Sequence, residues 1–222
     1  MMHSLKKVLV IGATGLVGKT LVLLLNQTLD CQQINVIVRR KNDLFLNQKK
    51  IQQIVLDDFL LLNSQDLAGY SHVFSCLGST LKQAGSKSAF YHVDYEMNVH
   101  IAHLLQNTTT HLLIVSSMGA NAASPFFYNR VKGKLENTLQ NLNLYRLSII
   151  RPSLLIGQRE HGRFLEDLGQ KIYQTCSKVL PKQFKYLPVT ANQVAHTMVD
   201  AARNQTQSCE MYANLKIQQY PR

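Results

Sequence analysis

The sequence predicts an α/β protein in which a doubly wound parallel sheet is covered by helices on both faces. Its 222 residues suit a single domain. Short β-branched segments that are apolar on both faces alternate with longer segments of helical periodicity. A glycine-rich turn joins the first of these strands to the first helix. Alternation of this kind is typical of parallel sheets whose strands are connected by helices.

Strand and helix patterns succeed one another up to about Ile150. The first strand, KVLVI, is β-branched and apolar throughout, as expected of a strand buried within a parallel sheet. The expected strands are Lys7–Ile11, Asn35–Arg39, Ile51–Leu56, His72–Cys76, Leu112–Ser116 and Tyr145–Ile150. The expected helices are Gly15–Thr28, Ser88–Gln106 and Tyr128–Asn141.

The pattern is less regular beyond Arg151-Pro152. Helices are expected over Arg163–Lys178 and Asn192–Asn204, and a last strand over Glu210–Leu215. We expect these segments to form a small cap over the carboxyl ends of the strands, where open α/β sheets bind their ligands. The chain is thus predicted to be one domain, 1–222, with 152–222 contributing the substrate-side cap.

Composition narrows the classes of partner. The formal net charge is +11 and the isoelectric point is about 9.6, which suits an anionic ligand or surface. No nucleic-acid-binding motif and no block of like charges accompanies this excess, so nucleic acid is not expected as a partner. The four cysteines form no CxxC pair and have no spacing typical of a metal site, so no metal is expected.

The amino-terminal region superficially resembles a signal peptide. An apolar run from Val8 to Leu25 follows two lysines, but glycines interrupt it and no small-residue cleavage site follows. The run is also too broken to span a bilayer. A cytoplasmic location without a membrane span is therefore expected.

A glycine loop follows the first strand. In GATGLVGKT, Gly12, Gly15 and Gly18 lie between a buried strand and an apolar helix. Glycines permit a tight turn and close approach to a pyrophosphate, which the amino terminus of the next helix also attracts. This context predicts a Rossmann-type dinucleotide-binding fold. The alternative is a Walker A loop ending in Gly18-Lys19-Thr20, but its first glycine would fall at Ala13.

The end of the second strand indicates which dinucleotide is bound. NAD-binding proteins carry an acidic residue there, whereas this chain has Arg39-Arg40-Lys41. An arginine offers a planar fork to a 2′-phosphate, so NADP (NADPH) is expected, although a simple basic turn is the alternative. Asp57 and Asp58 follow the third strand, where either can accept from an adenine amino group or cap a turn.

The fifth strand leads into candidate catalytic residues. It ends in Ser116-Ser117, and Tyr128 and Lys132 follow at i and i+4 on one face of the next helix. A nearby ammonium favours a tyrosine phenolate, which can exchange a proton with a carbonyl or alcohol, and a serine can orient the same oxygen. A second Tyr-x-x-x-Lys, Tyr212 and Lys216, lies in a strand-like segment where the two residues are expected about 13 Å apart.

These motifs together carry a resemblance to a family. The segments are GATGLVG, SCLGST, FYHVDYEMN, LLIVSSMGANAASPFFYNRVKGKLE and IIRPSLLIG, between Lys7 and about Gly157. The chain resembles atypical short-chain dehydrogenase/reductases, close to the HIV Tat-interactive oxidoreductase-like group. The resemblance implies NADPH binding and assigns a part of the nucleotide to each motif. By position, the pyrophosphate would be bound by Thr14, Gly15, Leu16 and Val17, and the 2′-phosphate by Arg39. The nicotinamide ribose would be bound by Leu77, Gly78, Tyr128 and Lys132, and the nicotinamide pocket would be lined by Arg151, Pro152 and Ser153.

The expected function is an NADP-dependent oxidoreductase that acts on a small carbonyl or alcohol substrate. Two alternatives use the same motifs. One is a regulatory protein that senses NADPH without catalysis, and the other is a nucleotide-sugar epimerase, for which the part after Arg151 is short. Substrate, reaction direction, oligomeric state and the choice between Ser116 and Ser117 stay open at the level of sequence.

Overall fold

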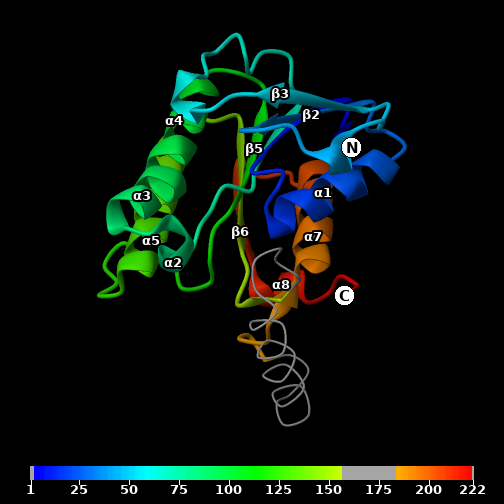
Figure 1. Ribbon diagram of the computed structural model, residues 1–222. Helices are drawn as coiled ribbons and strands as arrows, with labels where there is room; N and C mark the ends of the chain where they lie inside the picture. The colour runs from blue at the N-terminus through cyan, green and yellow to red at the C-terminus, as the bar shows by residue number, and fades with distance from the viewer. Residues whose placement is uncertain (1–2, 157–183, 222) are drawn as a thin grey trace.

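The central element of the protein is a seven-stranded parallel sheet in the order β3-β2-β1-β4-β5-β6-β9. This computed structural model describes residues 3–156 and 184–221. Helices cover both faces of the sheet, α1 and α7 on one side and α3, α4 and α5 on the other (Figure 1). The predicted fold class is confirmed. The strands are β1 (Lys7–Ile11), β2 (Gln33–Val38), β3 (Ile51–Val55), β4 (His72–Ser75), β5 (His111–Val115), β6 (Arg146–Arg151) and β9 (Cys209–Ala213).

The helices agree with the predicted ones in position, with shifts of one or two residues at most ends. Short 3₁₀ turns, η1 (Asp43–Phe45) and η2 (Phe59–Leu61), flank the edge strand β3. No helix of the described ranges is long and apolar enough to cross a bilayer. The helices are α1 (Leu16–Gln27), α2 (Leu81–Ala84), α3 (Lys87–Tyr91), α4 (Met97–Leu104), α5 (Phe127–Gln140), α7 (Ala191–Asn204) and α8 (Asn214–Ile217).

The sheet reverses its strand order between β1 and β4. The chain runs outward from β1 to β3 on one side and from β4 to β9 on the other. Ligands of open α/β sheets bind at the carboxyl edge beside such a reversal. The order is that of Rossmann-type folds, so it favours a dinucleotide-binding loop over the Walker A alternative for GATGLVGKT.

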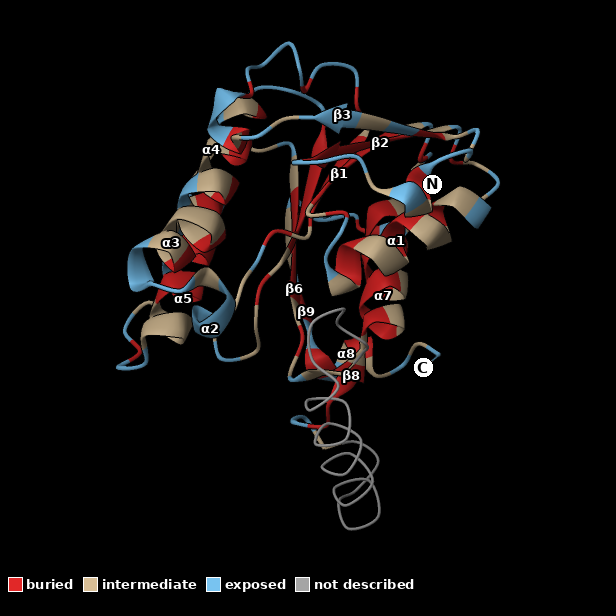
Figure 2. Cartoon of the chain, viewed as in Figure 1, coloured by how far each residue is buried: buried red, intermediate tan, exposed pale blue. Residues whose placement is uncertain are grey.

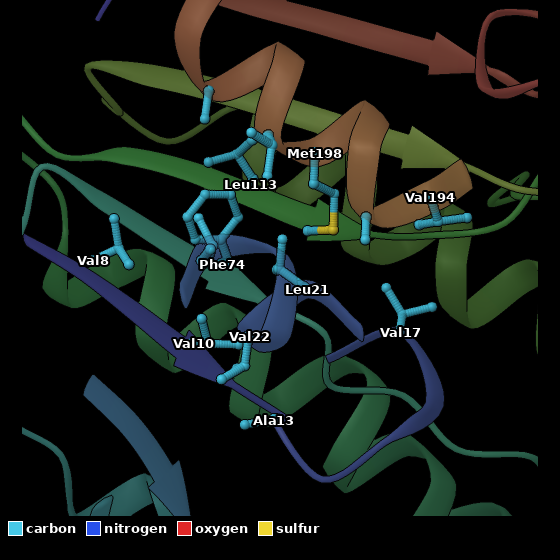
Figure 3. Packing of buried hydrophobic residues seen from close by; sticks show 14 of the residues in the cluster. Val8, Val10, Ala13, Val17, Leu21, Val22, Phe74, Leu113, Val194 and Met198 are labelled. Carbon is cyan, nitrogen blue, oxygen red and sulfur yellow. The ribbon is translucent and has the colours of Figure 1, made fainter. Parts of the chain in front are cut away.

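Two hydrophobic cores explain why the strands are apolar on both faces. Val8 and Val10 of β1 face the core under α1 and α7, whereas Leu9 and Ile11 face the core under α4 and α5. Buried residues gather on the sheet and on the helix faces turned toward it (Figure 2). Side chains of α1 and α7 meet over Phe74 and Leu113 of the sheet, as Figure 3 shows.

The carboxyl-terminal region differs from the expected cap. Helix α7 packs beside α1, and β9 joins β6 in parallel register as the seventh strand. Three apolar side chains of α7, those of Val194, Ala195 and Met198, are fully buried against the sheet. Their removal from water stabilises this packing, and a helix in a peripheral cap would not bury them to the same extent. Near the carboxyl edge lies the two-stranded pair β7 (Leu155–Ile156) and β8 (Val189–Thr190). The expected helix Arg163–Lys178 lies outside the described residues.

The expected helix Ser88–Gln106 contains a π-helical turn. Helices α3 and α4 are joined through η3 (His92–Glu96), whose hydrogen bonds are of the π type. A π turn adds a residue to the helical repeat and so shifts which side chains face inward. Asp94, in the middle of this turn, is fully buried.

Two histidines are buried at the amino-terminal side of the sheet. Nε2 of His72 donates to the carbonyl of Ala202 at 3.0 Å, and Nε2 of His111 lies 2.8 Å from Oγ of Ser148. Burial lowers the pKa of His72 to about 4 and that of His111 to about 2, with a smaller contribution from nearby positive groups such as Arg146. Both rings are therefore neutral in the folded protein at neutral pH.

We expect the protein to lose stability in mild acid because of these histidines. Below about pH 6.5 the unfolded chain takes up protons on both rings, whereas the folded chain does not until the pH approaches 4. The free energy of unfolding should fall by about 2 kcal/mol for each histidine between pH 7 and pH 5. Urea unfolding at the two pH values measures this loss.

The variant His111→Gln should retain a hydrogen-bonding group beside Ser148 and show a smaller loss between pH 7 and pH 5. The matched control is His103→Gln, because His103 is exposed. An identical pH dependence in wild type and His111→Gln would contradict the assignment of the acid sensitivity to His111.

Candidate functional site

A groove of about 970 Å³ lies at the carboxyl edge of the sheet, beside the reversal of strand order. Its walls come from the turn after β1, the turn after β4, the end of β5 and one face of α5. The lining residues include Thr14, Gly15, Leu16, Val17, Leu77, Gly78, Ser116, Tyr128 and Lys132, all of which were predicted site residues. The fold thus brings together motifs that are more than 100 residues apart in the sequence.

The three glycines of the first turn have different roles. Gly12 has a φ of +76°, and a Cβ there would lie 2.6 Å from the carbonyl carbon of Cys76. A Cβ on Gly18 would lie 2.2 Å from the carbonyl oxygen of Gly12. These two glycines therefore allow backbone segments to approach more closely than any side chain would permit. Gly15 is less restricted, since its Cβ would make one close contact, 3.3 Å from the backbone oxygen of Gly12.

Gly15 is the residue of this turn that opens toward the groove. It is the N-cap of α1 and has no side chain to cap the amides of the first helical turn. Leu16 and Val17 of that turn line the groove. Uncapped amides at a helix amino terminus attract phosphate groups, so the turn is suited to a pyrophosphate.

A basic pocket of about 540 Å³ continues from the groove. It is lined by Thr14, Arg39, Arg40, Lys41, Asn42 and Asp57, of which Thr14, Arg39 and Asn42 also line the groove. The structure separates the two aspartates after β3. Asp58 caps η2 by accepting from the amide of Leu60 at 2.9 Å, whereas Asp57 is the one that lines the pocket.

One face of α5 carries three functional side chains. Tyr128, Lys132 and Glu136 follow at intervals of four residues and so share a face. Tyr128 lines the groove, and its ring packs 5.4 Å from that of Phe90. The sequence analysis predicted Tyr128 and Lys132 as site residues but not Glu136. The four-residue spacing, continued by one helical turn, would have pointed to Glu136 as well.

Lys132 is held by a buried carboxylate. Its Nζ lies 2.8 Å from Oδ1 of Asp94 and 3.4 Å from the carbonyl oxygen of Val115, and both charged side chains are almost fully buried. Burial by itself lowers the pKa of Lys132, but the Asp94 carboxylate, together with Tyr128 and Glu136, more than offsets burial and raises this pKa. The ammonium is therefore charged. Sequence analysis missed Asp94, although it lies within the segment FYHVDYEMN, where it is an acidic residue among apolar ones.

The two serines after β5 are in different environments. Ser116 is 3% exposed and lines the groove, and its hydroxyl donates to the carboxylate of Glu136. The same carboxylate accepts from the guanidinium of Arg151, whose Nε lies 3.0 Å away. Oγ of Ser117 is buried and has no hydrogen-bond partner among the described residues. Ser116 is thus the serine at the groove. Because its proton is directed at Glu136, its hydroxyl can accept a hydrogen bond from a ligand but not donate one.

The predicted nicotinamide-pocket residues after β6 do not line the groove. Arg151 is paired with Glu136. The carbonyl of Pro152 accepts from the amide of Met118 at 2.9 Å, and Oγ of Ser153 donates to the carbonyl of Leu187 at 2.6 Å. These contacts hold the segment behind the groove wall.

The second Tyr-x-x-x-Lys motif lies away from the groove. Strand β9 ends at Ala213 and α8 follows, so Nζ of Lys216 lies 4.2 Å from the centre of the Tyr212 ring. The expected separation of about 13 Å does not apply, because the segment leaves the strand conformation between the two residues. Tyr212 is only 2% exposed and belongs to the hydrophobic core, so neither residue serves the site.

We expect alanine substitutions to separate the roles of the glycines. Gly18→Ala should destabilise the protein by several kcal/mol because its Cβ overlaps the backbone of Gly12. Gly15→Ala should destabilise the protein clearly less, because its backbone has a φ of −74° and its Cβ contact at 3.3 Å requires a shift of only a few tenths of an ångström. Chemical denaturation of the two variants measures the difference. Equal destabilisation would contradict the distinction between packing and groove-lining glycines.

The strand order, the glycine turn at the first crossover and the groove beside the reversal define a Rossmann-type α/β protein. Solved structures have the same fold. The chain is similar to UDP-glucuronic acid 4-epimerase from Bacillus cereus in complex with NAD, with a TM-score of 0.70, 15% identity and coverage of 93% of this chain and 77% of that one. It is also similar to the PhqB reductase domain from Penicillium fellutanum, with a TM-score of 0.65, 15% identity and coverage of 95% and 67%.

Sequence comparison identifies the family. The HIM1 family model matches residues 34–189. The mitochondrial protein FMP52 of Candida albicans is 32% identical over 204 residues, which cover 87% of this chain and 86% of that protein. The mitochondrial fmp52 of Aspergillus fumigatus is 33% identical over 178 residues, covering 78% and 76%. The chain belongs to the HIM1 family and is a homologue of the FMP52 proteins.

The names of these relatives correct one expectation from the sequence. Relatives that match most of the chain are named mitochondrial proteins, so the expectation of a cytoplasmic location was wrong. That expectation rested on the lack of a recognisable leader in the first residues. Such a lack carries no positive information about the compartment in which a protein works.

Proposed function

We propose that the protein is an NADP-dependent oxidoreductase that transfers hydride to or from a carbonyl or alcohol substrate. The observation that carries the proposal is the groove itself. It combines the open helix terminus at Gly15, the basic pocket of Arg39, and the pair Tyr128 and Lys132. The resemblance to atypical short-chain dehydrogenase/reductases, including the HIV Tat-interactive oxidoreductase-like group, supports the same function.

The groove residues fit a dinucleotide along its length. Thr14, Gly15, Leu16 and Val17 would hold the pyrophosphate at the amino terminus of α1, and Arg39 and Arg40 would hold the 2′-phosphate. Asp57 would accept from the adenine amino group, and Leu77 and Gly78 would border the nicotinamide ribose. Gly78 has no side chain to separate the groove from Nζ of Lys132, from which a Cβ at this position would lie 3.5 Å away.

The residues around Tyr128 support proton transfer to a substrate oxygen. A bound NADPH would supply the hydride for reduction, and the oxidised form, NADP+, would accept the hydride in the reverse reaction. Tyr128 donates a proton to the oxygen during reduction or removes it during oxidation. The Lys132 ammonium, charged because of Asp94, stabilises negative charge that develops nearby. Ser116, whose proton is directed at Glu136, accepts a hydrogen bond from a ligand hydroxyl or amide.

One observation favours a second function, NADPH sensing without turnover. The sequence analysis expected a serine to orient the substrate oxygen, which a hydroxyl does most directly by donating a hydrogen bond to it. Here the Ser116 hydroxyl donates to Glu136, and the Lys132 ammonium is paired with Asp94. With these two donors directed at protein carboxylates, fewer donors face a substrate oxygen, whereas the residues proposed to hold the nucleotide are unaffected. Turnover across a panel of aldehydes and ketones separates the two functions.

We expect the protein to bind NADPH more tightly than NADH. One charge-assisted contact to the 2′-phosphate contributes roughly 1.5–3 kcal/mol, which corresponds to about 10–150-fold in affinity. Fluorescence titration of both nucleotides measures the ratio, and Arg39→Ala should reduce it toward unity. Lys49→Ala is the control, because Lys49 is exposed and lies outside the basic pocket. Equal affinities in the wild type would contradict NADP specificity.

We expect Tyr128→Phe to abolish most turnover while leaving NADPH binding nearly intact. The substitution removes only the hydroxyl group, and a positioned acid or base contributes roughly 10²–10⁴-fold to rate. Consumption of NADPH at 340 nm with a substrate found in the panel measures the effect. The control is Tyr145→Phe, since Tyr145 is 47% exposed and does not line the groove. A wild-type rate for Tyr128→Phe would rule out this mechanism, and tight NADPH binding without any substrate would favour sensing.

A further inference from the structure

Asp94 connects two walls of the groove. It lies in the π-helical turn η3, is fully buried as a residue, and is one of the groove-lining residues. Its Oδ1 is 2.8 Å from Nζ of Lys132 on α5, and its Oδ2 accepts from the amide of Ser79 at 2.8 Å. Ser79 belongs to the turn after β4. A single carboxylate therefore fixes the position of α5 relative to that turn.

Gly78 lines the groove beside the ion pair. A Cβ on Gly78 would lie 3.5 Å from both Oδ1 of Asp94 and Nζ of Lys132. Because Gly78 has no side chain, a ligand group can approach the pair over its backbone. Most other residues at this position would place atoms between the ligand and the ammonium.

The donors of Lys132 indicate what the pair is for. An ammonium has three N–H donors. Asp94 takes one, and the carbonyl of Val115 lies within reach of a second. Within the described residues no hydrogen-bond acceptor is recorded for the third donor, and Lys132 lines the groove, so the two protein contacts would direct this donor toward a ligand there. A buried ion pair adds little net stability compared with apolar residues of the same volume, so stability alone does not account for this pair.

We infer that Asp94 is a positioning residue that fixes the Lys132 ammonium toward the ribose hydroxyls of a nucleotide in the groove. This inference rests on the proposed nucleotide binding. Asp94 itself needs no contact with the nucleotide, because it acts through Lys132. The π turn serves the same end, since it brings an acidic side chain inward from a helix whose other inward residues are largely apolar.

The test is NADPH binding as a function of pH. Fluorescence titration with NADPH between pH 6 and pH 10 compares the wild type with Asp94→Asn. Wild-type affinity should depend less on pH than that of the variant, because Asp94 helps to keep Lys132 charged. Asp94→Asn should bind roughly 10-fold more weakly at pH 7. Its affinity should fall further as the pH rises, because burial favours neutral Lys132 and only the weaker effects of Tyr128 and Glu136 then oppose burial.

A double-mutant cycle separates positioning from a purely structural role. Lys132→Met should weaken binding and abolish the pH dependence seen in Asp94→Asn. Adding Asp94→Asn to Lys132→Met should cause little further loss of affinity, because the inferred effect of Asp94 on the nucleotide passes through the Lys132 ammonium, and Asn can still accept from the amide of Ser79. The control is Asp30→Asn, which breaks the ion pair of Asp30 with Arg203 outside the groove and should leave NADPH binding unchanged.

A second variant keeps the inference testable if Asp94→Asn does not fold. Gly78→Ala retains both charges and has ordinary van der Waals space, yet its methyl group lies over the ion pair. It should fold normally and bind NADPH several-fold more weakly. Wild-type affinity in folded Asp94→Asn at every pH, or in Gly78→Ala, would overturn the inference alone. A wild type that does not bind NADPH would overturn the proposed function and this inference together.

Discussion

The structure depends on the close approach of two backbone segments at the start of the chain. The carbonyl oxygen of Gly12 lies where a Cβ on Gly18 would be, so α1 can begin directly after β1 only if Gly18 has no side chain. The same approach places the turn against the end of β4, because Gly12 touches the backbone of Cys76. With α1 fixed in this direction, its amino terminus points into the groove and its apolar face meets α7 over the sheet (Figure 3).

A second constraint comes from charged groups buried on the other side of the groove. Asp94, Lys132 and Glu136 are each 2% exposed or less, and each is paired. Taking such charges out of water is costly, so each buried charge requires a partner with suitable geometry. The pairs connect α5 to three other elements: the π turn through Asp94, the end of β5 through Ser116, and the end of β6 through Arg151. The face of α5 that carries Tyr128 is therefore held at fixed points.

These two constraints act on opposite walls of one groove. The glycine turn offers backbone amides and space, which suit phosphate groups, and α5 offers a hydroxyl and an ammonium, which suit proton transfer. Membership of the HIM1 family and homology to the FMP52 proteins extend over most of the chain. The solved Rossmann-type structures share the fold but are only about 15% identical to the chain, so the chemistry is argued from the groove residues.

The sequence by itself determined the elements whose signals are local. Apolar strands, the glycine turn, Arg39-Arg40-Lys41 and the helical spacing of Tyr128 and Lys132 are all visible within a few residues. The tertiary structure decided which residues meet across long separations. It placed Asp94 against Lys132 and Glu136 against Ser116, and it added α7 and β9 to the main domain. The physical reason is that burial and charge pairing depend on neighbours in space, and an acidic residue in a helix has the same local pattern whether it faces water or a buried ammonium.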